Sequence, residues 1–363
     1  MKKIRVKLGR NSYDVLLSTG LLHHAGQEIR RLLPSKNSRV FVVTSKNVRR
    51  HWGDVLETSL GQAKVPFQVL EMDDGEPAKR LPTVEQLAEQ LVGAKADRQA
   101  LLVAFGGGVV GDCAGFLASI FMRGIPVVQV PTTVLAQADA SIGGKTGVNL
   151  HAGKNLIGAF HQPQAVLIDP AVLTTLDDRE FRAGLYESLK CGVISDRRLF
   201  EFMAGQPEKI CERDRRAVER VIVDSVRVKA AVVSADERES GRRRILNFGH
   251  TIGHALEAAT GYTQLLHGEA IAWGMIAATA IGQEIGTCAE ATAQRIRSAV
   301  MAYGPLPPVT ARTEDIVARL ASDKKAVAGA IHFVLPWTIG KTKIVNDVPM
   351  RVVTEAIEKT LGN

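Results

Sequence analysis

Residues 101–112 read LLVAFGGGVVGD and join an apolar run to a glycine-rich turn, and a helical pattern follows over residues 113–120. A glycine-rich turn between a strand and a helix lets backbone N–H groups approach a phosphate at the positive end of the helix. We therefore predict a strand, a turn that binds a dinucleotide pyrophosphate, and a helix. The glycine spacing departs from G-x-G-x-x-G, and no acidic residue follows about 20 positions later. A tight turn without a ligand is the alternative.

The residues around this turn alternate between strand-like and helical patterns. Strand-like runs cover residues 4–8, 13–18, 39–44, 66–72, 100–105, 127–130 and 165–168, and helical patterns cover residues 20–33, 47–60 and 83–95. This alternation predicts an α/β fold with a Rossmann-like, mostly parallel sheet that is covered by helices on both faces.

The pattern changes after residue 175 and becomes mainly helical, with one long helical segment over residues 208–236. Only residues 332–335 and 342–345 look strand-like in this part of the chain. We therefore predict two domains. Residues 1–176 would form the α/β domain that binds the dinucleotide, and residues 177–363 a mainly helical domain.

The composition limits the class of protein. With 45% hydrophobic and 23% charged residues, the chain of 363 residues is typical of a globular protein. A net charge of +8 suits an anionic partner, but dispersed charges and 5% aromatic residues argue against nucleic-acid binding. The longest apolar run, residues 270–282, is shorter than the ~18–20 residues that span a bilayer. Scattered cysteines and an N-terminus without an apolar signal core predict a cytoplasmic protein.

Three histidines lie close together in the helical half. His250 and His254 have i, i+4 spacing, which places them on one face of a helix, and His267 precedes the long apolar run. Two or three imidazoles and one carboxylate form an open catalytic zinc site. Spacing alone favours His250 and His254 as the ligand pair, and two helical histidines satisfied by their neighbours are the alternative. Four carboxylates are candidates for the remaining ligand: Asp139, Glu187, Glu257 and Glu269.

Two further loops carry residues that suit phosphate binding. After a strand-like run, residues 74–79 read DGEPAK, in which Glu76 could bond ribose hydroxyls and Lys79 could reach a phosphate. Residues 141–155 combine glycines with lysines, which suits an oxyanion cradle but does not match the Walker pattern. Each loop, like the charged residues 323–325, could also be an exposed segment without a ligand.

Together these segments resemble the 3-dehydroquinate synthase family, one of the sugar-phosphate cyclases. The resemblance runs from about residue 70 to residue 345 and rests on residues 74–79, 106–112, 122–124, 129–139, 142–160, 179–190, 239–257, 267–275 and 323–325. It implies a lyase of the shikimate pathway, which leads to chorismate and the aromatic amino acids. The enzyme would convert 3-deoxy-D-arabino-heptulosonate 7-phosphate, a small anionic sugar phosphate, to 3-dehydroquinate and phosphate.

The resemblance also implies cofactors, a mechanism and an assembly. The enzyme would use NAD and one divalent metal ion, zinc or cobalt. We hypothesise transient oxidation by NAD, phosphate elimination, re-reduction and an intramolecular aldol closure. The protein would form a homodimer.

The resemblance assigns roles to individual residues. The metal ligands would be Glu187, His250 and His267, which replaces the pair favoured by spacing and turns His254 toward the substrate. The catalytic residues would be Asp139, Lys190, Asn247 and His254. The other substrate-binding residues would be Arg123, Lys145, Asn155, Lys229, Arg243, Lys324 and Lys325, with one of the last two on the phosphate. NAD would be bound by Asp74, Gly75, Glu76, Lys79, Gly107, Gly108, Val109, Val110, Gly111, Asp112, Thr132, Thr133, Lys145, Lys154, Thr174 and Thr175.

Two stretches depart from the family pattern. The usual Ala-Glu-Val-Ile-Lys-Tyr-Gly reads YESLKCG at residues 186–192, which keeps the spacing of Glu187 and Lys190, and the usual Thr-Leu-Pro reads TLD at residues 175–177.

Three other functions are alternatives to the one that the resemblance implies. They are a sister cyclase that forms a valiolone or an inosose, an iron-type NAD-dependent polyol dehydrogenase, and a basic nucleic-acid-binding protein.

Overall fold

The computed structural model describes residues 1–326 and 331–362, with the backbone alone for residues 321–326. The chain forms two compact units, Met1–Asp177 with Lys229–Arg238, and Asp178–Val228 with Glu239–Asn363. The first break falls one residue after the predicted boundary at 176. The segment Lys229–Arg238 differs from the prediction, because it belongs to the first unit although it lies far along the chain in the helical half.

The first unit is built on a seven-stranded sheet with the order β1-β2-β9-β6-β5-β3-β4. The strands are β1 Lys2–Val6, β2 Tyr13–Leu17, β3 Val40–Ser45, β4 Phe67–Met72, β5 Leu101–Gly106, β6 Val127–Pro131 and β9 Ala165–Ile168. Only the β1–β2 pair within this sheet is antiparallel. The predicted Rossmann-like α/β fold is therefore confirmed.

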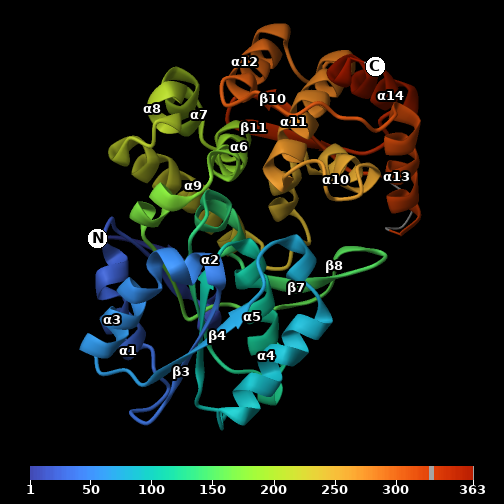
Figure 1. Cartoon of the computed structure of the whole chain (residues 1–363). Helices are drawn as coiled ribbons and strands as arrows, with labels where there is room; N and C mark the ends of the chain where they lie inside the picture. The colour runs from blue at the N-terminus through green and yellow to red at the C-terminus, as the bar shows by residue number, and fades with distance from the viewer. Residues whose placement is uncertain (327–330, 363) are drawn as a thin grey trace. The chain divides into compact units, whose positions relative to one another are not determined.

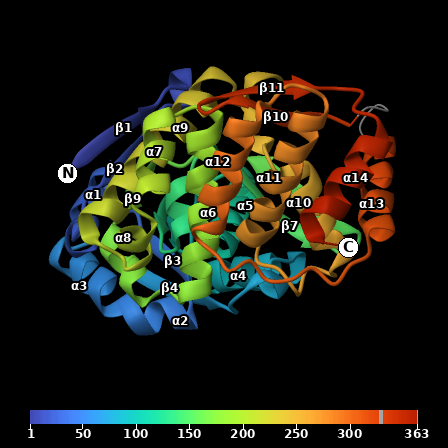
Figure 2. The same cartoon turned by 90° about the horizontal axis from the view of Figure 1, so that it is seen from above.

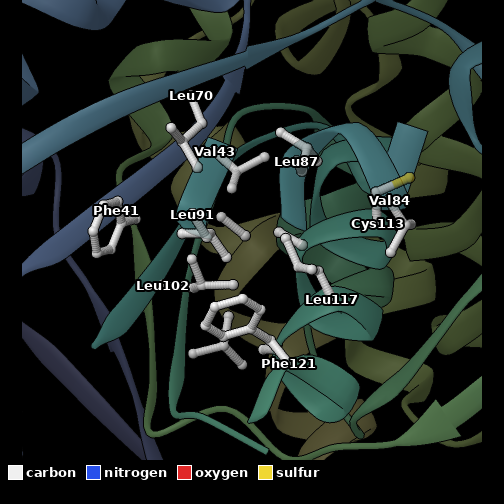
Figure 3. Packing of buried hydrophobic residues seen from close by; sticks show 14 of the residues in the cluster. Phe41, Val43, Leu70, Val84, Leu87, Leu91, Leu102, Cys113, Leu117 and Phe121 are labelled. Atoms are coloured by element: carbon white, nitrogen blue, oxygen red, sulfur yellow. The ribbon is translucent and has the colours of Figure 1, made fainter. Parts of the chain in front are cut away.

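Helices cover both faces of this sheet because its central strands are apolar on both sides. Phe41 and Val43 of β3 pack against α4 (Leu81–Gly93) and α5 (Gly108–Ile120), through side chains such as Leu87 and Leu117 (Figure 3). The alternate residues of β3 pack toward the other face, where α1 (Ala25–Arg31) and α3 (Asp54–Gln62) lie (Figure 1). Burial of two apolar faces holds the carboxyl ends of the parallel strands in fixed positions.

Short elements connect these strands and helices. They are η1 Gly9–Asn11, η2 Leu21–His24, α2 Lys46–Val48, η3 Arg49–Gly53, η4 Glu76–Ala78, η5 Phe121–Arg123, η6 Ala136–Ala140 and η7 Pro170–Thr175. The segment expected to be a lysine- and glycine-rich loop is an antiparallel hairpin of β7 (Lys145–Leu150) and β8 (Gly153–Phe160). Its polar and glycine-rich composition lacks the apolar alternation that indicates a strand, and the sequence prediction was wrong here.

The second unit is mainly helical, as predicted. Its elements are α6 Asp178–Ile194, α7 Arg197–Gly205, α8 Pro207–Cys211, the first part of α9 Arg215–Ala235, η8 Arg242–Asn247, α10 His250–Ala259, α11 His267–Glu284, α12 Glu290–Met301, α13 Thr313–Ala326, β10 Phe333–Thr338, β11 Lys341–Val345 and α14 Met350–Leu361. Helix α11 packs between α6 and α10 (Figure 2). In the described ranges, no helix combines the length and the apolar character needed to cross a membrane.

The long helical segment predicted over residues 208–236 is two helices. Arg213 has a positive φ of 62°, which ends α8, and the Asp214 carboxylate accepts a hydrogen bond from the Ala217 N–H at 2.8 Å. An aspartate that accepts from the first turn of a helix is a start signal, so α9 begins here. The apolar periodicity continues across this break, which hides it in the sequence.

Candidate active site

The residues predicted to bind NAD follow the carboxyl ends of parallel strands in the first unit. Residues 74–79 follow β4, residues 107–112 follow β5, Thr132 and Thr133 follow β6, and Thr174 and Thr175 end η7 after β9. Because parallel strands end at one edge of their sheet, these loops share that edge. Strand β4 lies on one side of β3, and the next strand of the chain, β5, lies on the other side. Open α/β sheets bind ligands at such a switch point in the strand order.

The glycine turn has the predicted strand–turn–helix form. β5 ends at Gly106, and α5 begins at Gly108, five residues before the helical pattern seen in the sequence. The Thr132 N–H donates to the Gly106 carbonyl at 3.0 Å, and the Gln129 side chain donates to the Gly111 carbonyl at 3.1 Å. These bonds tie the turn and the first turn of α5 to β6. The positive end of the helix dipole therefore lies at this edge.

A network of polar side chains joins the other loops at this edge. The Lys79 ammonium donates to Asp112 and to the Asn155 amide oxygen, each at 2.5 Å. Burial raises the pKa of Asp112, and the Lys79 charge opposes this shift without cancelling it. For Lys79, burial lowers the pKa, but the charges of Asp112 and Glu76 outweigh burial, so the pKa of Lys79 is raised. Lys154 approaches Glu76 at 3.9 Å. Asn155, predicted to hold substrate phosphate, thus lies among residues predicted to bind NAD.

The other candidate residues of this unit occupy separate elements. The Lys229 ammonium donates to Asp139 of η6 at 2.6 Å, and both side chains are largely buried. Arg123 ends η5 with a positive φ of 70°, and Lys145 is exposed at the start of β7. Thr175 accepts a hydrogen bond from the Trp52 indole at 2.8 Å.

Three helices of the second unit bring Glu187, His250 and His267 together. The Glu187 Oε1 atom lies 3.6 Å from His250 Nε2 and 3.6 Å from His267 Nε2. These distances exceed a hydrogen bond, and Oε1 is buried without a hydrogen-bond partner among the described residues. Ligands of a tetrahedral ion, at about 2.0–2.2 Å from it, lie about 3.3–3.6 Å from each other. The distance from Glu187 Oε1 to each Nε2 atom therefore fits two ligands of one divalent metal ion.

The second nitrogen of each imidazole is oriented by a neighbouring oxygen. His267 Nδ1 lies 3.3 Å from Glu257 Oε2, and His250 Nδ1 lies 3.3 Å from the Phe248 carbonyl. Such contacts hold a proton on Nδ1 and leave the Nε2 lone pair for a metal. Both Nε2 atoms face Glu187. The orientation of this donor set is therefore better defined than that of the His250 and His254 pair favoured by spacing.

Charges around the donor set favour ionised Glu187. Burial opposes ionisation, but the paired Lys190 ammonium and the two imidazoles hold the pKa of Glu187 well below its usual range. Burial and the charge of Lys190 hold the pKa of His250 well below its ordinary value. Burial acts in the same direction on His267, but Glu187 and Glu257 outweigh it and raise the pKa of His267 to about 9.

Of the other residues of this unit that were predicted to bind substrate or act in catalysis, His254 lies beside the donor set. The exposed His254 ring is centred 5.2 Å from that of His250, and one nitrogen from each of His250, His254 and His267 lies within 4.8 Å of the others. Asn247 donates to Glu239 at 2.8 Å, and Arg243 is buried. Lys324 and Lys325 belong to α13, but their side chains lie outside the described part of the chain.

Two of the four carboxylates considered as ligands have other partners. Glu269 accepts from the Arg179 guanidinium at 2.7 and 2.8 Å and from the Leu266 N–H at 2.8 Å, so it stabilises the start of α11. Asp139 pairs with Lys229 in the first unit. The sequence did not indicate Glu239 as a partner of Asn247 or Glu257 as a partner of His267, because irregular segments and a change of helix separate them.

Close helix packing positions the three candidate ligands. A Cβ atom on Gly268 would lie 1.8 Å from the Ala183 carbonyl oxygen of α6, and one on Gly274 would lie 1.9 Å from the Gly249 carbonyl oxygen. Gly249 precedes His250 at the start of α10. Glycine at these two positions therefore lets α11 approach α6 and the start of α10, which brings His267 and His250 to Glu187.

Comparison with known proteins identifies the family of the chain. Residues 69–183 match the family model for 3-dehydroquinate synthase N-terminal, and residues 184–326 match that for 3-dehydroquinate synthase C-terminal. The 3-dehydroquinate synthase of Koribacter versatilis is 54% identical, with 99% of this chain and 98% of the relative covered. That of Solibacter usitatus is 48% identical, and both chains are covered completely.

Solved structures give the same architecture. The valiolone synthase ValA of Streptomyces hygroscopicus, solved with NAD+ and Zn2+, is 31% identical with a TM-score of 0.88, over 99% of this chain and 98% of ValA. A 2-deoxy-scyllo-inosose synthase with carbaglucose-6-phosphate, NAD+ and Co2+ is 26% identical with a TM-score of 0.88, over 99% of both chains. An iron-containing alcohol dehydrogenase, 17% identical with a TM-score of 0.68 over 96% of this chain and 97% of its own, shares the fold alone. The chain belongs to the 3-dehydroquinate synthase family.

Proposed function

We propose that the protein converts 3-deoxy-D-arabino-heptulosonate 7-phosphate to 3-dehydroquinate and phosphate in the shikimate pathway. The observation that carries this proposal is 54% identity over nearly the whole length of a relative named 3-dehydroquinate synthase. The donor set of buried Glu187 and the partly exposed His250 and His267 supports it, because this reaction needs a metal that binds substrate hydroxyls. A valiolone- or inosose-forming activity is less well supported, since those enzymes are 31% and 26% identical.

The metal proposed for Glu187, His250 and His267 is zinc or cobalt. One carboxylate and two imidazoles leave further coordination positions for substrate oxygens. Related enzymes were solved with Zn2+ or Co2+. Glu257 and the Phe248 carbonyl would orient the two imidazoles, and the Lys190 charge keeps Glu187 ionised.

NAD is proposed to bind at the carboxyl edge of the sheet in the first unit. Close backbone approach at Gly107 and Gly108, together with the positive end of α5, suits the pyrophosphate. Glu76 would bond ribose hydroxyls. The remaining contacts are proposed for Asp74, Gly75, Lys79, Val109, Val110, Gly111, Asp112, Thr132, Thr133, Lys145, Lys154, Thr174 and Thr175.

In this mechanism the chain binds an anionic substrate and controls protons, while bound NAD supplies a transient hydride acceptor and bound metal acidifies a substrate hydroxyl. Cationic groups would neutralise the phosphate and carboxylate, and amide groups would donate hydrogen bonds to them. The residues proposed for substrate contact are Arg123, Asp139, Lys145, Asn155, Lys190, Lys229, Arg243, Asn247, His254, Lys324 and Lys325. NAD is regenerated in each cycle, so the net reaction is a lyase reaction.

We further propose a homodimer that works in the cytoplasm. Ile120 and Met122 near the end of α5, and Leu156 and Phe160 of β8, are large apolar side chains that are 40–60% exposed. A second copy would remove such side chains from water. All four cysteines are free thiols, which suits a reducing compartment. Sedimentation of the purified protein would test the dimer.

Metal affinity should depend on pH through a single proton. With a pKa of about 9, His267 carries a proton at neutral pH, whereas Glu187 is ionised and His250 is neutral. Metal binding must release the His267 proton, so affinity should rise about tenfold per pH unit from pH 6 and level off near pH 9. Calorimetry in buffers of different ionisation enthalpy measures the released proton. An affinity that is constant over this range would contradict the assignment.

The proposed reaction is tested by phosphate release from the heptulosonate phosphate. Purified protein with NAD and stoichiometric zinc or cobalt should release phosphate, and a chelator should abolish release until metal is restored. Glucose 6-phosphate, the sugar counterpart of the carbaglucose-6-phosphate bound in the inosose synthase structure, serves as the matched comparison and should give far slower release. Full activity after removal of all metal would exclude the proposed site.

A further inference from the structure

Asn149 joins three segments of the first unit, and no role in binding has been assigned to it so far. Its backbone N–H donates to the Lys79 carbonyl at 2.8 Å, and its side-chain Nδ2 donates to Glu76 Oε1 at 2.7 Å. Its Oδ1 accepts from the Asn155 N–H at 2.9 Å. The two partners fix the orientation of the amide, because a carboxylate only accepts and a backbone N–H only donates. Only 8% of Asn149 is exposed, so these bonds are largely shielded from water.

The strand geometry explains why this side chain reaches so many partners. The pairing of β7 with β8 shifts between Val148 and Leu150, because Val148 pairs with Ile157 but Leu150 pairs with Gly153. Asn149 therefore lies opposite residues 154–156, and the extra residues of this bulge belong to β8. A bulge takes its extra residues out of the regular ladder, so the Asn155 N–H is available to the Asn149 side chain. Asn149 also forms an isolated parallel bridge with Arg80, next to the Glu76–Lys79 segment.

The network continues from Asn149 to the glycine turn. Asn155 adopts a left-handed backbone with a φ of 56°, a conformation that residues other than glycine uncommonly adopt. Its N–H is held by Asn149, and its Oδ1 accepts from Lys79. Lys79 in turn donates to Asp112 of α5, just after the first turn of that helix. Asn149 therefore fixes Glu76 directly and Asn155 from one side, while Lys79 fixes Asn155 from the other.

We infer that Asn149 is a positioning residue for both ligands. Its amide N–H group holds the Glu76 carboxylate for the NAD ribose, and its amide oxygen holds Asn155 for the sugar phosphate. The inference rests on the proposed function, from which Glu76 and Asn155 take their roles. It adds a residue whose two polar atoms serve two different ligands, so the two effects can be separated by substitution.

The substitution Asn149→Asp changes one of the two contacts. It keeps an oxygen for the Asn155 N–H but places a carboxylate against Glu76. At about pH 8 the Kd of NAD should rise at least tenfold, as expected for loss of a hydrogen bond to a charged group. The KM of the substrate at saturating NAD should change little. Asn149→Leu removes both contacts, so it should raise both the NAD Kd and the substrate KM.

A pH profile separates positioning from a general loss of structure. Two carboxylates that face each other share a proton at higher pH than an isolated one, and a shared proton restores the hydrogen bond. NAD binding by the Asn149→Asp protein should therefore recover as pH falls from about 8 to about 6. The wild-type protein carries the same neighbouring groups, Lys79, Arg80, Asp112, His151 and Lys154, and should not show this recovery.

Direct NAD titration, monitored by protein fluorescence without substrate, gives the decisive comparison. Asn37→Asp introduces the same charge at an exposed residue before β3, at the opposite edge of the sheet, and should leave the NAD Kd unchanged. Thermal unfolding without ligands identifies a variant that fails to fold. Should Asn149→Leu fail to fold, the Asn149→Asp protein alone carries the test. No NAD binding by the wild type would contradict the proposed function. Wild-type affinity in Asn149→Asp, at every pH, would overturn the inference about Asn149.

Discussion

The substitution His250→Ala is expected to remove both metal and activity, whereas His254→Ala should keep the metal and lose rate. His250 supplies one of the two Nε2 atoms that face Glu187 at 3.6 Å, with its Nδ1 held by the Phe248 carbonyl. Loss of one of the three proposed protein ligands should lower metal content to background, and with it phosphate release by at least about a thousandfold. His254 is exposed, and we propose that it faces the substrate.

Metal content after dialysis, measured by atomic emission, and initial rates of phosphate release distinguish the two variants. His161→Ala, a histidine of the first unit that bonds the Ile125 carbonyl at 2.9 Å, is the matched control and should keep its metal. Equal metal content in His250→Ala and His254→Ala would contradict the assignment of ligands. It would favour the set of three histidines instead.

The substitution Gly274→Ala should strongly destabilise the second unit. Alanine normally stabilises a helix relative to glycine by about 1 kcal/mol. Here its Cβ would lie 1.9 Å from the Gly249 carbonyl oxygen, and the next nearest atoms are also backbone atoms of Gly249 and Gly253, which cannot move aside as a flexible side chain can. We expect a loss of about 3 kcal/mol or more, together with weaker metal binding because α10 begins at His250 beside this contact.

Gly205→Ala in α7 is the matched control, since a Cβ there would meet no atom within 4 Å. It should leave stability unchanged or raise it slightly. Chemical denaturation with and without added zinc gives both the free energy of unfolding and the metal dependence. A Gly274→Ala protein as stable as the Gly205→Ala protein would show that α10 and α11 do not approach as closely as the structure has them.

The sequence predicted the architecture because burial leaves a strong periodic signal. The apolar strands β3, β5 and β6 and the glycine turn after β5 are visible as patterns, and their order implies one parallel sheet with loops at a common edge. The hairpin of β7 and β8 was missed because glycines and polar residues interrupt its alternation. The return of Lys229–Arg238 to the first unit was also missed, since α9 is continuous in the sequence.

The candidate ligands show what spacing can and cannot predict. The i, i+4 relation of His250 and His254 is a property of one helix, so it identified two histidines on one face. The approach of Glu187 and His267 depends on packing of α6, α10 and α11 through Gly268 and Gly274, which leaves no periodic signal. The resemblance to a known family supplied that set, and the structure places Glu187 Oε1 at 3.6 Å from each Nε2 atom, a distance that fits two ligands of one ion.

Turnover with a large molar excess of substrate over NAD tests the central claim most directly. The proposed cycle regenerates NAD, so metal-loaded protein should release many phosphates per NAD and leave no net NADH absorbance at the end. Product formation without NAD should be negligible. Accumulation of one NADH per substrate consumed, or phosphate release that stops after one equivalent of NAD, would contradict the account and favour a dehydrogenase.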